Sequence, residues 1–205
     1  VEDYTTISDV SKMLFQAPDM TRSQLEKPAE YKPNMRWNYS SGTTNLLSGI
    51  LRKQFKTHQE YLDFWYSALI DKIGMNSMVI ETDMAGNYVG SSYGWATTRD
   101  WSKFGLLYLH KGNWNGEQIF NENWAKYTAT PTNRSEGRYG GHFWLNAGGS
   151  FRDVPRDMYY CSGFQGQMVV IIPSLDLVVV RMGLKEDPEF DFNGMLKGII
   201  ESVKK

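Results

Sequence analysis

Two runs of β-branched residues near the C-terminal end restrict the possible fold most strongly. They are QMVVII at 167–172 and LVVVRM at 177–182, and the short segment PSLD at 173–176 separates them. Valine and isoleucine favour extended backbone, and a Pro-Ser-Leu-Asp segment is typical of a tight turn. We therefore predict two adjacent antiparallel strands, with one or two more strands in YGGHFWLN at 139–146 and DMYYCSGF at 157–164.

Before residue 139, the apolar residues recur at a helical period instead. Capping signals support three of the helices, namely Ser8, Thr57 with Glu60, and Thr97 with Asp100. The predicted helices cover 7–16, 40–55, 57–74, 97–110, 121–127 and, after the strands, 190–205.

The predicted order is helices, then an antiparallel sheet, then a terminal helix, which is an α+β arrangement. We divide the chain into a mainly helical region at 1–138 and the strands with their terminal helix at 139–205, as parts of one structural unit. In the helix over 40–55 the apolar period runs through Leu46, Leu47, Ile50 and Leu51.

Composition excludes several classes of function. The 205 residues carry a net charge of −1 without a long basic run, so neither nucleic acid nor an anionic membrane surface is an expected partner. No apolar stretch is long enough to span a membrane, and the first ten residues do not resemble a signal peptide. One cysteine and three scattered histidines give no metal-ligand spacing, so we expect no metal.

Two patterns suggest catalysis but have a simpler structural interpretation. GSSYG at 90–94 matches the G-x-S-x-G nucleophile elbow, yet that elbow needs a buried strand directly before it and a helix directly after it. We therefore expect an ordinary loop there. Cys161 could pair with His142, but a cysteine within a strand more often behaves as a small apolar residue.

Three motifs in consistent order resemble those of the penicillin-recognising serine hydrolases, a family of class C β-lactamases, DD-peptidases and related esterases and amide hydrolases. YSSGTTNLLSGILR at 39–52 resembles the Tyr-x-Asn element of that family. SSYGWATTRDWSKFGLLYLHKGNWNGEQIF at 91–120 and CSGFQGQMVVIIPSLDLVVVRMG at 161–183 resemble its later helix and its Lys-Thr-Gly strand pair. The resemblance spans nearly the whole chain and implies a β-lactamase/transpeptidase-like fold.

The resemblance implies acyl transfer through a serine ester without any cofactor. It makes Tyr39 the proton-shuttling residue and places Ser41 where the family usually has asparagine. Ser162, Gly163 and Phe164 then belong to the substrate-binding strand, with the Phe164 amide as an oxyanion donor. Because Cys161 replaces lysine, the resemblance favours an ester or amide substrate over a β-lactam.

The S-x-x-K element that carries the family's nucleophile does not lie upstream of Tyr39 in these residues. We therefore expect the fold to be incomplete without an N-terminal segment and the chain alone to be inactive. The segment 177–182 should form an apolar sheet edge, covered by that N-terminal segment or by another copy. The resemblance also implies a periplasmic or exported bacterial protein.

Two other functions remain open at this stage. One is a penicillin-fold module that binds peptidoglycan-like peptides without catalysis, and the other is an enzyme that depends on Cys161. In every case we expect an aromatic cleft that accepts a small ester, amide or peptide, lined by Trp37, Tyr93, Trp95, His142, Trp144 and Tyr160.

Overall fold

The computed structural model describes residues 2–4, 6–184 and 190–203, and the chain forms two compact units. Unit 1 comprises Val1–Lys72 and Asn76–Ala96, and unit 2 comprises Ile73–Met75 and Thr97–Lys205. The units are delimited differently from the predicted division at residue 138, because the helices between Thr97 and that residue belong with the sheet.

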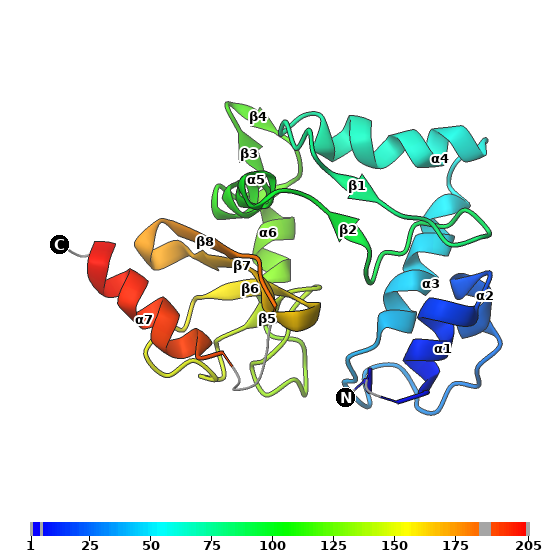
Figure 1. The fold of residues 1–205 in the computed structure, drawn as a ribbon, viewed down its shortest axis with the longest axis horizontal. Helices are drawn as coiled ribbons and strands as arrows, with labels where there is room; N and C mark the ends of the chain where they lie inside the picture. The colour runs from blue at the N-terminus through cyan, green and yellow to red at the C-terminus, as the bar shows by residue number, and fades with distance from the viewer. Residues whose placement is uncertain (1, 5, 185–189, 204–205) are drawn as a thin grey trace. The chain divides into compact units, whose positions relative to one another are not determined.

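Unit 1 is mainly helical (Figure 1). Ser8 and Thr57 each make a complete capping box at the start of a helix, as their sequence positions predict. The elements of this unit are α1 (Asp9–Gln16), α2 (Met20–Leu25), α3 (Ser41–Arg52), α4 (His58–Trp65) with the π-helical turn Tyr66–Ile70, and the antiparallel strands β1 (Val79–Ile80) and β2 (Gly94–Trp95).

The most deeply buried face of α3 is not the one that carries its leucines. Leu46 and Leu51 are half-buried. Leu47 is 46% exposed and Ile50 is 48% exposed. The buried residues of α3 are small or polar, namely Ser41, Gly42, Asn45, Ser48 and Gly49. A Cβ atom at Gly42 would overlap the Gln24 side chain, and one at Gly49 would overlap Thr21. Close approach of α2 therefore decides which face of α3 is buried.

Unit 2 combines helices with a four-stranded antiparallel sheet of order β5-β6-β7-β8 (Figure 1). The predicted strands are therefore confirmed, and a turn around Pro173–Leu175 joins the last two. The elements are α5 (Thr98–Leu109), the hairpin β3 (Asn113–Trp114) and β4 (Glu117–Gln118), α6 (Glu122–Thr128), β5 (Trp144–Leu145), β6 (Tyr159–Gly163), β7 (Gln167–Ile172), β8 (Leu177–Arg181) and α7 (Phe192–Val203).

Both faces of this sheet are buried. On one face, Leu196 and Ile200 of α7 pack against Met168, Val170 and Ile172 of β7. The other face belongs to a second apolar cluster that includes Ile171 of β7 and residues of α5. Each buried side chain of this size stabilises the fold by about 1.5–3 kcal/mol relative to exposure, so burial on both faces contributes strongly to the stability of unit 2.

Strand β8 lies at the edge of the sheet, as predicted for 177–182. Among the described residues, β8 pairs with β7 alone, in a register that runs from Met168 opposite Arg181 to Ile172 opposite Leu177. What covers this edge in the whole protein stays a prediction.

Candidate active site

Tyr39 lies immediately before the N-terminus of α3, as its motif suggests. The helix begins at Ser41, and Ser40 occupies the N-cap position with extended backbone at φ −152° and ψ 118°. Tyr39 and Trp37 are both half-buried. The first backbone N–H groups of a helix have no partner within the helix, so this position offers hydrogen-bond donors beside the phenol.

The carboxylate of Glu2 binds at this helix terminus. The backbone N–H of Ser41 donates to one carboxylate oxygen at 2.5 Å, and the Ser41 hydroxyl donates to the other at 2.7 Å. The Tyr4 hydroxyl donates to the same second oxygen at 2.6 Å. A negative charge at a helix N-terminus is stabilised by the helix dipole. Sequence reasoning missed Glu2, because no local pattern connects residues 39 positions apart.

The pKa of Tyr39 is raised, first by burial and then by the negative charge of Glu2. At neutral pH the phenol therefore keeps its proton and can donate it. Before the phenol could accept a proton as a general base, a cation would have to offset both effects.

Two other predicted residues of unit 1 lie in different surroundings. Tyr93 packs against the buried cluster that contains Val10, Met13 and Val89, and its hydroxyl donates to the Leu14 carbonyl at 3.4 Å. Trp95 is exposed, and its indole N–H donates to a carboxylate oxygen of Glu81 at 2.7 Å. Tyr93 thus contributes to the core of unit 1.

The GSSYG segment is a loop, as expected. The N–H of Ser92 donates to the Val89 carbonyl at 3.1 Å in a turn, and the residues before it form an isolated bridge between Thr82 and Tyr88. This backbone does not have the strand that a nucleophile elbow requires.

In unit 2, Ser162 and Gly163 form the end of β6. Ser162 pairs with Met168 and Gly163 pairs with Gln167, so both belong to the antiparallel ladder with β7. Phe164 follows in the connecting turn and is 69% exposed. This segment presents exposed backbone at the end of a well-packed strand.

The structure brings together Trp144 and Tyr160, which are directly opposite each other on β5 and β6. The Tyr160 ring makes an edge contact with Phe151 at 5.4 Å, and burial raises the pKa of its phenol to about 12. His142 precedes β5 with a left-handed backbone at φ +65°. Although His142 is exposed overall, partial burial of its ring lowers the pKa, so the imidazole is neutral at pH 7.

Cys161 has the properties of a core residue. It packs against the apolar cluster of Phe143, Leu145, Tyr159 and Ile171. Burial raises the pKa of the thiol to about 12, which leaves almost no thiolate at neutral pH. Because the thiolate is the nucleophilic form, this environment argues against an enzyme that depends on Cys161.

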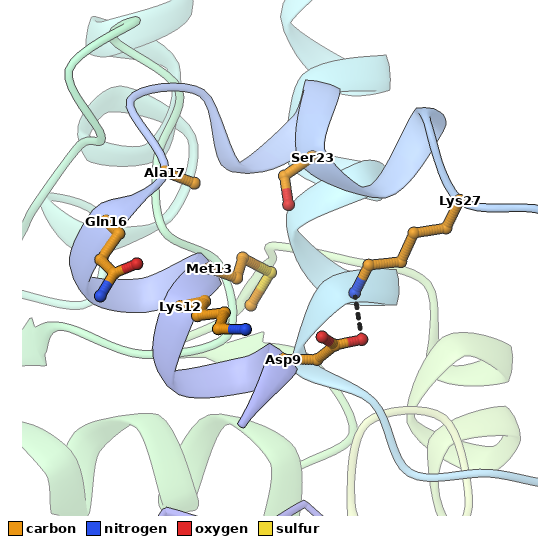
Figure 2. Close-up of a pocket in the computed structure, with 7 residues that line it drawn as sticks. All are labelled: Asp9, Lys12, Met13, Gln16, Ala17, Ser23 and Lys27. Carbon is orange, nitrogen blue, oxygen red and sulfur yellow. Dashed lines mark hydrogen bonds and ion pairs between the residues drawn. The ribbon is translucent and has the colours of Figure 1, made fainter. Parts of the chain in front are cut away.

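Two hollows on unit 1 lie away from the predicted residues. Figure 2 shows the first, of about 300 Å³, where Lys27 pairs with Asp9 at 3.3 Å. The second, of about 480 Å³, is lined by the basic residues Arg22, Arg52 and Lys53 among others. Neither hollow includes a residue of the predicted aromatic cleft.

The described residues contain no cluster of three or more His, Cys, Asp or Glu side chains that could hold a metal ion. Within the same part of the chain, every helix is too short or too polar to cross a membrane.

Comparison with known protein families shows which family this chain belongs to. The family described as Beta-lactamase matches residues 3–203. The chain belongs to the beta-lactamase family. The match covers both units and all three motifs, and it agrees with the α+β fold of helices and antiparallel strands.

Three solved structures with a similar fold are named as hydrolases or beta-lactamases. A candidate 6-aminohexanoate-dimer hydrolase from Bacillus anthracis has a TM-score of 0.69 and 19% identity, over 90% of this chain and 47% of that one. A candidate beta-lactamase from Bacteroides dorei has a TM-score of 0.64 and 12% identity, over 100% of this chain and 68% of that one. A beta-lactamase from Mycobacterium bovis has a TM-score of 0.62 and 17% identity, over 86% and 66%.

This beta-lactamase family chain thus spans about half the length of the first of these proteins and about two thirds of the other two. None of the curated protein sequences matches it.

Proposed function

We propose that the protein containing this chain is a serine hydrolase that cleaves an ester or amide bond through an acyl-serine intermediate. The observation that carries the proposal is the position of Tyr39, directly before the N-terminus of α3, in a chain that matches the beta-lactamase family over residues 3–203. The serine and lysine would lie in the part of the hydrolase that these residues do not contain.

In the proposed reaction, the serine oxygen attacks the substrate carbonyl while its proton passes to the lysine, and a tetrahedral intermediate forms. Backbone N–H groups, including that of Phe164, would stabilise its negative oxygen. The C–N or C–O bond then breaks, and Tyr39 would donate a proton to the leaving group. The raised pKa of Tyr39 supports this donor role, because the phenol is protonated at neutral pH. The lysine would then return its proton to Tyr39, and water would hydrolyse the acyl-serine, so that the acid leaves and the serine hydroxyl is restored.

Departures from the family motif favour an ester or a simple amide as substrate. Ser41 has a shorter side chain than the usual asparagine and offers only one donor, which here contacts Glu2. Cys161 lies in the cluster on one face of the sheet and provides no cation for a β-lactam carboxylate. Trp144 would suit an apolar acyl or ring group, whereas the Tyr160 ring packs against the core cluster that includes Val170 and Leu196.

The test is a turnover assay of the full-length protein with a p-nitrophenyl ester, a short amide and a chromogenic cephalosporin. We expect ester or amide turnover with an initial burst from acyl-enzyme accumulation, slower turnover of the cephalosporin, and none by the 205-residue chain alone. Absence of turnover and of a burst with all three substrates would contradict the proposal.

A non-catalytic binding module is the second candidate. The pairing of Ser41 with Glu2 favours it, because this carboxylate raises the pKa of Tyr39 and opposes its use as a base. That module would bind a peptidoglycan-like peptide, and the same assay would show neither turnover nor an initial burst. The assay therefore distinguishes the two functions.

A further inference from the structure

The turn between β6 and β7 has a backbone that needs support from outside the turn. Gln165 and Gly166 both have left-handed conformations, with φ of +59° and +84°. Glycine adopts this region freely, but a residue with a Cβ atom adopts it at a cost in free energy. Phe164 is 69% exposed, so burial of its ring does little to hold the turn.

Arg181, at the end of β8, holds this turn from one side. Its guanidinium donates from Nη1 to the carbonyl oxygen of Gly166 at 2.7 Å. The same guanidinium lies over the Phe190 ring at 4.0 Å and near the Phe192 ring at 5.2 Å. These cation–π contacts hold the guanidinium in one position. The guanidinium can therefore hold the Gly166 carbonyl, and with it the turn, in one conformation.

Gln167 ties the beginning of β7 to the segment that follows β8. Its side-chain oxygen accepts from the Gly183 N–H at 3.0 Å, and its side-chain nitrogen donates to the Gly183 carbonyl at 2.6 Å. Gln167 is also the residue opposite Gly163 in the β6–β7 ladder. A Cβ atom at Gly163 would lie 3.0 Å from the Gln167 Cβ, so the two backbones fit closely.

We propose that Arg181 and Gln167 are positioning residues that orient the end of β6, and with it the backbone amide of Phe164, for the reaction. The proposal rests on the proposed serine-hydrolase function, because only that reaction uses this amide as an oxyanion donor. The side chains of Arg181 and Gln167 bond the backbone of Gly166 and Gly183, which both come after this segment, and neither bond involves the segment itself. Their contribution would therefore be to geometry and not to substrate contact.

The test compares Arg181→Met, Arg181→Lys and Gln167→Glu in the full-length protein. Glutamate can still accept from the Gly183 N–H, but its second oxygen would face the Gly183 carbonyl and repel it. We expect Arg181→Met and Gln167→Glu to lower kcat by about 10- to 100-fold while KM changes by less than about threefold, because displaced donors weaken transition-state binding. Arg181→Lys keeps one donor and should recover part of kcat.

Arg152→Met is the matched control, because Arg152 is an exposed arginine of the same unit that pairs with its neighbour Asp153. Its kcat should equal that of the wild type. Hydrogen–deuterium exchange over 162–167 provides a readout that is independent of activity. Exchange there should be faster in Arg181→Met and Gln167→Glu and unchanged in Arg152→Met.

The outcomes separate this inference from the proposed function. Faster exchange together with a lower kcat supports the positioning role. Unchanged exchange, faster exchange with wild-type kcat, or a change confined to KM would each overturn it. A wild type without turnover would overturn the proposed function, and the positioning role with it, whatever the exchange shows.

Discussion

At the scale of single residues, Tyr39 is the side chain on which the proposed chemistry depends most. It lies just before α3, with a pKa that burial and Glu2 both raise. We predict that Tyr39→Phe lowers kcat of the full-length hydrolase by about 10²- to 10⁴-fold, because the substitution removes only the oxygen of a positioned proton donor. Tyr31→Phe, at an exposed tyrosine of the same unit, is the control and should leave kcat unchanged. Steady-state kinetics provides the measurement, and wild-type turnover by Tyr39→Phe would limit Tyr39 to a packing role.

The sequence predicts the local part of this site and omits the distant part. The helix start beside Tyr39 follows from a motif of a few neighbouring residues. The contact of Glu2 with Ser41 and the contact of Arg181 with Gly166 join residues that are far apart in the sequence. Such contacts arise from tertiary packing, and no periodicity or spacing of residues in the sequence predicts them.

At the scale of elements, α5 packs against the sheet through a glycine. A Cβ atom at Gly105 would lie 2.6 Å from a methyl carbon of Val178 and 3.1 Å from one of Val169. We predict that Gly105→Ala lowers the free energy of unfolding by about 1–3 kcal/mol, the usual effect of overpacking. The control is Gly198→Ala in α7, where a Cβ would meet nothing within 4 Å.

Gly198→Ala should instead raise the free energy of unfolding by roughly 0.5–1 kcal/mol, because alanine loses less backbone entropy in a helix. Chemical denaturation of the full-length variants measures both effects. If the free energy of unfolding of Gly105→Ala equalled that of Gly198→Ala, the result would contradict the close packing of α5 on β7 and β8.

The comparison of α3 with the sheet shows why some elements are predictable. The strands follow from β-branched runs that are buried on both faces, so composition alone is informative. In α3 the leucines form an apolar stripe, yet Gly42 and Gly49 face α2, because close helix contact selects small residues. The periodicity of the apolar residues predicts the helix α3 but not which of its faces α2 covers.

At the scale of the whole molecule, buried tyrosines make stability depend on alkaline pH. Burial is the main reason that the pKa values of Tyr88, Tyr108 and Tyr160 rise from 10.0 to about 12. A raised tyrosine pKa means that the folded protein retains a proton that the unfolded chain releases. This contribution to stability is complete below about pH 10 and is lost as the pH rises toward about 12.

We therefore predict that the free energy of unfolding falls steadily above about pH 10, the ordinary pKa of tyrosine. Denaturation at a series of alkaline pH values, with an ultraviolet titration of tyrosine ionisation, measures this dependence. Tyr108→Phe should reduce it, whereas Tyr127→Phe, at an exposed tyrosine, should not. A free energy of unfolding that stays constant through this range would contradict the assignment of these phenols as buried.

The central claim is that this beta-lactamase family chain contributes Tyr39 and the β6 strand to a hydrolase whose nucleophilic serine lies outside residues 1–205. The most direct measurement is fluorophosphonate labelling of the full-length protein, followed by peptide mapping of the adduct. We predict one labelled serine, outside residues 1–205, with labelling slowed in Tyr39→Phe. No adduct, or an adduct on a serine within residues 1–205 such as Ser92, would contradict the claim.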